Sequence, residues 1–337
     1  MAGAVRAFEG SGEFLRPLPL SPARYAALTR LFFMHPFIGA ACVATALLAT
    51  ALPALAAAPA DAPSAAAHVA DRISVQTEGK GPDLILIPGL ASSKDVWDQA
   101  SASLRQTHRL HRVQVAGFAG TAAGANAAGE VAAPVAEAIA RYIAQQQLKA
   151  PVVVGHSLGG EVALMLAARH PEAVGGLVVV DALPFFSLLF DPAATVATST
   201  PGAAVFRNNL LSTPKEQADA LQAASVARLV KTPSERAAVV DAALRSDRTT
   251  VANASYELMT TDLRPELARI RVPVQVIYAW DPLYGVPAAD VDARFRGAYA
   301  GLAKARFTRI DDSFHFVMLD QPQRFVEALR TSLVPDH

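Results

Sequence analysis

A serine between two glycines has the clearest chemical potential in this sequence. The run Gly155-His156-Ser157-Leu158-Gly159 follows the apolar stretch Pro151–Val154 and precedes a helical pattern that extends to Arg169. A serine at the apex of a tight strand-turn-helix junction has a strained backbone, and glycines at positions 155 and 159 remove side chains that would collide across the turn. The turn lifts the Ser157 hydroxyl above the strand ends, which makes it a candidate nucleophile.

Two backbone amides are expected to form an oxyanion hole beside this serine. The first is the amide of Leu158, the residue after the candidate nucleophile. The second comes from the loop Pro88–Ser93, which follows the predicted strand Asp83–Ile87, and Leu90 is the expected donor. An ordinary turn in this loop is the alternative interpretation.

His315 is the expected general base, if the chain order is nucleophile, acid and histidine. It lies in Asp311–Phe316, directly after the last predicted strand, so it reaches the carboxyl edge of a parallel sheet. His156 is expected to point away from its neighbour Ser157 and to support the site from behind. Five other histidines lie near the ends of the chain, at a helix end, or at the opposite edge of the sheet: His35, His108, His111, His170 and His337.

An aspartate must orient the imidazole and stabilise its cation. Asp281 follows the apolar run Val274–Trp280 and leads toward His315, so it is the favoured acid. Asp181 ends the preceding predicted strand in the same way and is the alternative, although it leads into a long insertion.

Short apolar strands alternate with amphipathic helices in the part of the chain that must position these groups. The alternation predicts a mostly parallel sheet with helices on both faces, built from residues 72–182 and 263–337. The predicted strands are Ile73–Thr77, Asp83–Ile87, Arg112–Val115, Pro151–Val154, Leu177–Val180, Val274–Tyr278 and Arg306–Ile310. A helix is expected before the end of the chain, at Arg324–Leu333.

Residues 183–262 interrupt the alternation and predict a helical cap. Thr213-Pro214-Lys215-Glu216 and Thr232-Pro233-Ser234-Glu235 each suit a helix start with threonine at the N-cap and proline at N1. The apolar run Leu183–Phe190 is expected to line a pocket or to pack on the sheet.

These motifs resemble the α/β-hydrolase superfamily over about residues 72 to 335. The shared features are the Gly155–Gly160 elbow, Pro88-Gly89-Leu90, Asp281 and Phe314-His315-Phe316 followed by Asp320-Gln321-Pro322. The sequence departs from the family pattern where histidine usually precedes the oxyanion-loop glycine and where glycine usually precedes the catalytic histidine. Pro88 and Phe314 occupy these positions here. The segment Gln114–Phe118 also lacks the Asp and Pro of the family's turn.

The resemblance implies a serine hydrolase that cleaves a small to medium, fairly hydrophobic carboxylic ester through an acyl-enzyme. No metal or organic cofactor is expected. The same triad also serves thioesterases, lactonases, C–C hydrolases and acyltransferases. A catalytically silent ligand-binding protein is the alternative outside enzymes.

The composition excludes several other classes of protein. The chain has 337 residues, 52% of them hydrophobic and 18% charged, which excludes a disordered chain. Thirty basic residues balance thirty acidic ones, so no nucleic-acid partner is expected. The single cysteine, Cys42, rules out an internal disulfide or a cysteine metal cluster within one chain.

The N-terminal region predicts export. Residues 31–60 contain no Lys, Arg, Asp or Glu, and Arg30 precedes them. The run Ala54-Leu55-Ala56 is a small-x-small cleavage pattern, so residues 1–56 are read as a signal peptide and 57–71 as a linker. A periplasmic or secreted protein is therefore expected, with a retained membrane anchor at residues 31–57 as the alternative. Met34 is an alternative start.

Overall fold

The computed structural model describes residues 67–302 and 304–333. The predicted signal peptide, the alternative anchor at residues 31–57 and most of the predicted linker lie outside this part of the chain. No helix within residues 67–302 and 304–333 is long and apolar enough to cross a membrane.

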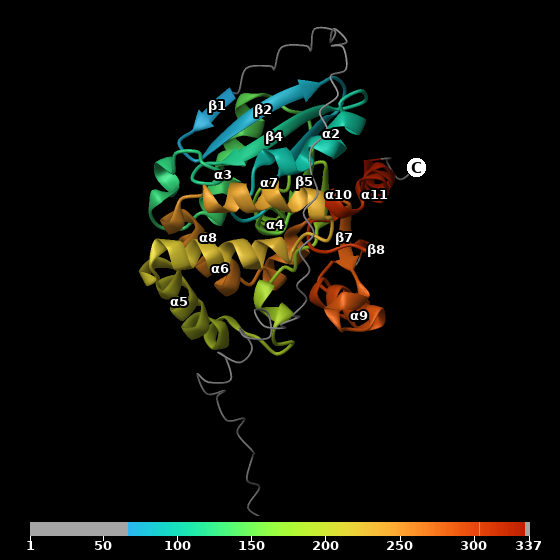
Figure 1. Ribbon diagram of the computed structural model, residues 1–337. Coiled ribbons are helices and arrows are strands. Elements are labelled where there is room, and N and C mark those ends of the chain that lie inside the picture. Colours follow the sequence, from blue (N-terminus) through green and yellow to red (C-terminus); the bar gives the residue numbers. More distant parts are fainter. Residues whose placement is uncertain (1–66, 303, 334–337) are drawn as a thin grey trace, which may run out of the picture. The chain divides into compact units, whose positions relative to one another are not determined.

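A single eight-stranded sheet organises the described residues, in the order β1-β2-β4-β3-β5-β6-β7-β8 (Figure 1). Its strands are β1 (Ala67–Ala70), β2 (Ile73–Gly79), β3 (Asp83–Ile87), β4 (Arg109–Val115), β5 (Val152–His156), β6 (Gly176–Val180), β7 (Val274–Trp280) and β8 (Arg306–Asp311). The contacts of β2 with β1 and with β4 are antiparallel, and every other contact between neighbouring strands is parallel. The predicted fold class and all seven predicted strands are confirmed.

The prediction of a linker over residues 57–71 was wrong at its end. Ala67–Ala70 forms β1 and pairs with β2 in a short, irregular antiparallel contact. This strand contains two alanines in four residues, and alanine is depleted in strands, so the sequence carried little strand signal. Antiparallel pairing with β2, and not the sequence of Ala67–Ala70 itself, accounts for this strand.

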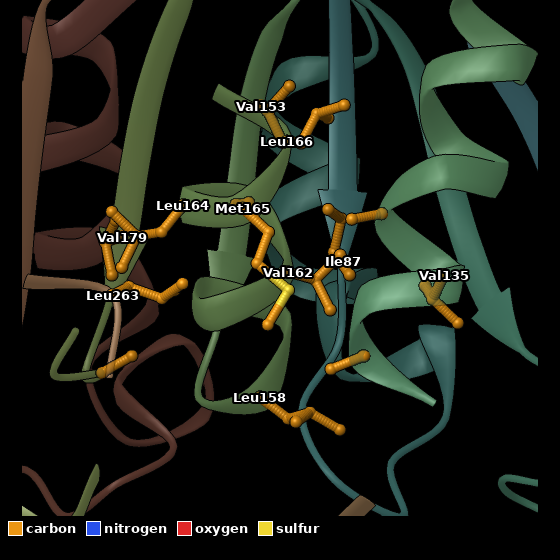
Figure 2. Packing of buried hydrophobic residues seen from close by; sticks show 14 of the residues in the cluster. Ile87, Val135, Val153, Leu158, Val162, Leu164, Met165, Leu166, Val179 and Leu263 are labelled. Atoms are coloured by element: carbon orange, nitrogen blue, oxygen red, sulfur yellow. The ribbon is translucent and has the colours of Figure 1, made fainter. Parts of the chain in front are cut away.

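Helices cover both faces of the sheet because successive side chains of each buried strand point to opposite faces. One face carries α3 (Ala132–Gln145), α4 (Leu158–Arg169) and α9 (Ala288–Ala298), whose apolar residues share a cluster with Ile87, Val153 and Val179. The other face carries α2 (Asp98–Leu104), the short α10 (Val317–Asp320) and α11 (Pro322–Leu333). Figure 2 shows Val162 and Met165 of α4 among the apolar side chains on the first face.

Four helices form the insertion between β6 and β7. They are α5 (Val196–Ser212), α6 (Lys215–Ala227), α7 (Pro233–Leu244) and α8 (Arg248–Thr260), with α5 against α8 and α6 against α7 (Figure 1). The predicted start of α7 is confirmed, with Thr232 at the N-cap and Pro233 at N1. The predicted start of α6 was one residue early, because Pro214 itself occupies the N-cap and Thr213 instead ends α5.

The apolar run at residues 183–190 packs on the main core. Leu183, Phe185 and Leu188 are buried in the cluster that contains α3 and α4. The Ser187 hydroxyl in the same run donates a 2.7 Å hydrogen bond to the Met259 carbonyl of α8. The run therefore joins the cap to the sheet, which is one of the two expected alternatives.

Candidate active site

Ser157 lies at the apex of a sharp turn between β5 and α4. Its backbone has φ 54° and ψ −121°, a region that favours glycine, and its N–H donates to the Val180 carbonyl of β6 at 3.0 Å. A Cβ on Gly155 would lie 2.0 Å from the Gly159 carbonyl oxygen, and one on Gly159 would lie 2.4 Å from that of Ile87. Gly155 is therefore required by a contact across the turn, as predicted, whereas Gly159 is required by the close approach of the β3 backbone at Ile87.

The loop after β3 lies directly beside this serine. A Cβ on Gly89 would lie 3.0 Å from both the Ser157 Cβ and the His156 Nδ1. Within residues 67–302 and 304–333, the amides of Leu90 and Leu158 donate to no other protein group. Both predicted amides are thus available to an incoming ligand, and Leu158 is also at the N-terminus of α4, where a developing negative charge is favoured.

His315 contacts an aspartate at the end of β6. Its Nδ1 lies 2.7 Å from Asp181 Oδ2, while Asp181 Oδ1 accepts a 3.0 Å hydrogen bond from the Ala279 amide of β7. A carboxylate only accepts, so the proton belongs on Nδ1 and the Nε2 lone pair is left to act as a base. The Asp181 carboxylate is therefore fixed through both oxygens, in a geometry that orients an imidazole. The Asp181 backbone has a positive φ of 46°.

The prediction that Asp281 orients His315 was wrong. Asp281 Oδ2 instead accepts a 2.6 Å hydrogen bond from Lys231 Nζ, and its Oδ1 accepts from the Leu283 amide at 2.9 Å. The register explains the difference: Val180 pairs with Ile277, so Asp181 is level with Tyr278, and Asp281 lies three residues beyond it. Three residues of strand correspond to about 10 Å. The alternative acid, Asp181, is the residue that the structure brings to His315.

His156 supports the site from behind, as expected. Its imidazole is fully buried, lies 4.5 Å from the His315 ring between centroids, and its Nε2 donates to the His315 carbonyl at 3.0 Å. Burial, together with the positive charge that His315 can carry, holds the pKa of His156 well below its usual range. His156 therefore remains neutral and acts as a fixed donor to the histidine loop.

Sequence reasoning did not find two residues that hold the histidine loop. Asp320 accepts hydrogen bonds from the backbone amides of Phe314, Lys231 and Thr232. Lys231 also ties the cap to Asp281 through its ammonium group. Asp320 had a signal in the sequence, because it belongs to the Asp-Gln-Pro run after His315. Nothing in the sequence distinguishes Lys231 from the other residues of the cap.

Two other histidines have their own partners outside this site. His111 contacts Asp83 and Tyr142 at the opposite end of the strands, and His170 contacts Glu137 at a helix end. Within the described residues, no group of three or more His, Cys, Asp or Glu side chains is arranged to hold a metal ion.

Residues 84–328 match the model of the alpha/beta hydrolase family. This match covers well over half of the sequence. The chain belongs to the alpha/beta hydrolase family. The membership confirms the resemblance seen in the motifs and identifies the protein as a hydrolase.

Curated relatives of this alpha/beta hydrolase are esterases. The chain is 29% identical over 257 residues to a pimeloyl-[acyl-carrier protein] methyl ester esterase of Nitrosomonas europaea, covering 75% of this chain and 96% of the relative. It is 32% identical over 251 residues to the enzyme of the same name in Aromatoleum aromaticum, covering 72% and 94%.

Solved structures show the same fold at lower identity. An enol-lactonase from Burkholderia xenovorans LB400 matches with a TM-score of 0.65 and 19% identity, over 80% of this chain and 99% of that one. An esterase from Exiguobacterium antarcticum matches with a TM-score of 0.64 and 18% identity, over 77% and 94%. These likenesses establish the architecture of this alpha/beta hydrolase.

Proposed function

We propose that this protein hydrolyses carboxylic esters through an acyl-enzyme on Ser157. The observation that carries the proposal is the 2.7 Å contact between His315 Nδ1 and Asp181 Oδ2, at the same sheet edge as the strained Ser157 turn. The esterase names of the curated relatives favour an ester over the thioester, lactone, C–C and acyl-transfer alternatives.

The proposed reaction has two half-steps. His315 Nε2 takes the Ser157 hydroxyl proton as the oxygen attacks the ester carbonyl, and the Leu90 and Leu158 amides donate to the oxyanion. The intermediate collapses as His315 returns the proton to the leaving alcohol, which leaves an acyl-serine. Water then attacks the acyl-serine, with His315 as base, and releases the acid and the free serine. Asp181 orients the imidazole and stabilises its cation throughout.

The proposed substrate is an uncharged, small to medium, fairly hydrophobic ester. The half-buried Leu90 in the loop beside the elbow supports this class. Because the relatives are named as methyl ester esterases, methyl and other short-alkyl esters are the first compounds to test.

Labelling with a fluorophosphonate probe tests the proposed nucleophile. Wild-type protein should be labelled at one serine and should hydrolyse a series of methyl and p-nitrophenyl acyl esters. Ser157→Ala should lose both properties, and His315→Ala should lower both by at least about a thousandfold. A folded wild type that is neither labelled nor active would contradict the proposal, and the ligand-binding alternative would replace it.

We also propose that the protein acts outside the cytoplasm, on the strength of the uncharged apolar residues 31–60 and the small-x-small pattern at Ala54–Ala56. Mass spectrometry of the protein expressed from its full sequence tests this proposal. A mature N-terminus near residue 57 is expected, and an intact N-terminus in a membrane fraction would instead favour the anchor.

A further inference from the structure

The loop that carries His315 is held at three consecutive residues. The Phe314 amide donates to Asp320 Oδ2 at 2.8 Å, the His315 carbonyl accepts from His156 Nε2 at 3.0 Å, and the Phe316 amide donates to the Leu229 carbonyl at 3.2 Å. Leu229 belongs to the cap, in the segment 229–232 between α6 and α7. The backbone after His315 is therefore bound directly to the cap.

Asp320 extends this connection to the backbone before His315. Besides the Phe314 amide, its carboxylate accepts from the Lys231 amide at 3.1 Å and from the Thr232 amide at 2.8 Å. Hydrogen bonds from amides to a carboxylate are shorter and stronger than those to a neutral acceptor. One side chain thus joins the histidine loop and the cap segment through three charge-assisted bonds.

Side chains dock the same cap segment onto the core. The Lys231 ammonium contacts the buried Asp281 at 2.6 Å and the exposed Asp312 at 3.6 Å. Val230 is fully buried in a cluster that also contains Phe316. The segment is therefore seated by apolar and ionic contacts on both sides of the histidine loop.

We propose that Asp320 is a positioning residue that couples the docking of cap segment 229–232 to the placement of the His315 imidazole. This inference rests on the serine hydrolase function proposed above. When the segment is seated, the amides around His315 have their acceptors and the ring is held against Asp181. If the segment is not seated, the Phe316 amide loses the Leu229 acceptor and Asp320 loses two of its three donors, so His315 is released.

Thr232→Pro tests the coupling from the cap side alone. Thr232 has φ −71° and ψ 110°, which suit proline, and its side chain makes no capping hydrogen bond. The substitution removes the amide hydrogen that Asp320 Oδ1 accepts and puts the proline Cδ in its place, so it breaks this bond from the cap side without replacing Asp320 or Phe314. Thr232→Ala is the matched control, because it removes the side chain and keeps the amide.

Asp320→Asn tests the carboxylate itself, and Asp241→Asn serves as a control in an exposed cap ion pair with Arg245. We expect kcat and the fluorophosphonate labelling rate to fall by at least about thirtyfold in Asp320→Asn and by about three- to tenfold in Thr232→Pro, since small misplacements of a catalytic group are costly. KM should change by less than kcat in both variants. Both control variants should remain within about twofold of the wild type.

Hydrogen exchange supplies a readout that does not depend on activity. Thr232→Pro should speed exchange at the Phe314 and Phe316 amides by at least about tenfold relative to Thr232→Ala. Unchanged exchange at these amides would overturn the coupling whether or not the enzyme is active. Equal kcat in Thr232→Pro and Thr232→Ala, with an active wild type, would also overturn it. A wild type without labelling or turnover would instead contradict the proposed hydrolase function.

Discussion

Two aspartates at the same sheet edge have different partners, and this difference supports different proposed roles for them. Asp181 contacts His315, whereas Asp281 contacts Lys231. We expect Asp181→Asn to lower kcat by about ten-thousandfold, because an amide no longer fixes the imidazole tautomer that can accept a proton. Asp281→Asn should lower kcat per folded molecule by less than about tenfold. Steady-state kinetics, with the folded fraction measured by circular dichroism, would check both values. A larger loss of kcat in Asp281→Asn than in Asp181→Asn would show that Asp281 is the acid.

The residues that the sequence predicted well are those whose signal is local. The Ser157 turn has its signature within five residues, because Gly155 is required by its contact with Gly159 across the turn. The identity of the acid depends on the register of β6 against β7, which pairs residues nearly a hundred positions apart. Chain order placed both aspartates at one sheet edge, and only the register separates them. Lys231 was missed for the same reason, since its partner Asp281 lies fifty residues away.

At the scale of elements, a buried carboxyl on α4 makes stability depend on pH. Glu161 is 2% exposed, and its Oε1 has no hydrogen-bond partner among the described residues. Burial, reinforced by the negative charge of Glu257 on α8, raises the pKa of Glu161 well above its usual range. Glu257 itself accepts hydrogen bonds from the first amides of α3, so it joins α8 to α3.

Glu161→Gln should therefore change how stability varies with pH. The folded state keeps a proton that the unfolded state loses above about pH 4.5, so the wild-type free energy of unfolding falls as pH rises above this value. The contribution of this group has a slope of at most about 1.4 kcal/mol per pH unit, up to the pKa of the folded state. Glutamine has no proton to lose, so the variant should gain stability over the wild type as pH rises from 5 to 8.

Urea unfolding at several pH values would measure this difference. Exposed Glu172 provides the control, and Glu172→Gln should track the wild type across the range. A constant difference between Glu161→Gln and the wild type at every pH would show that Glu161 is ionised in the folded protein.

At the scale of the whole molecule, the cap and the sheet share their apolar cores. Val230 of the cap lies in one buried cluster with Trp97, and Ala254 of α8 lies in the cluster that contains α3 and α4. Helices that share a core with the sheet are expected to unfold with it. Trp97 and Trp280 are the two tryptophans of the chain and both belong to the sheet part, whereas the four cap helices contribute strongly to far-UV circular dichroism.

Unfolding followed by tryptophan fluorescence and by far-UV circular dichroism should therefore give coincident transitions. Val230→Ala should destabilise the protein by about 2 kcal/mol and shift both transitions together, because the cavity opens in a core that both parts use. A loss of helix signal before any change in fluorescence would show that the cap unfolds independently.

The backbone of Ser157 has a consequence for the evolutionary fate of this fold. A serine with φ 54° and ψ −121° occupies a conformation that costs about 1–3 kcal/mol and that glycine adopts freely. Ser157→Gly should therefore stabilise the protein while it abolishes the proposed chemistry. A lineage released from selection for catalysis would therefore gain stability by losing the proposed nucleophile in one substitution.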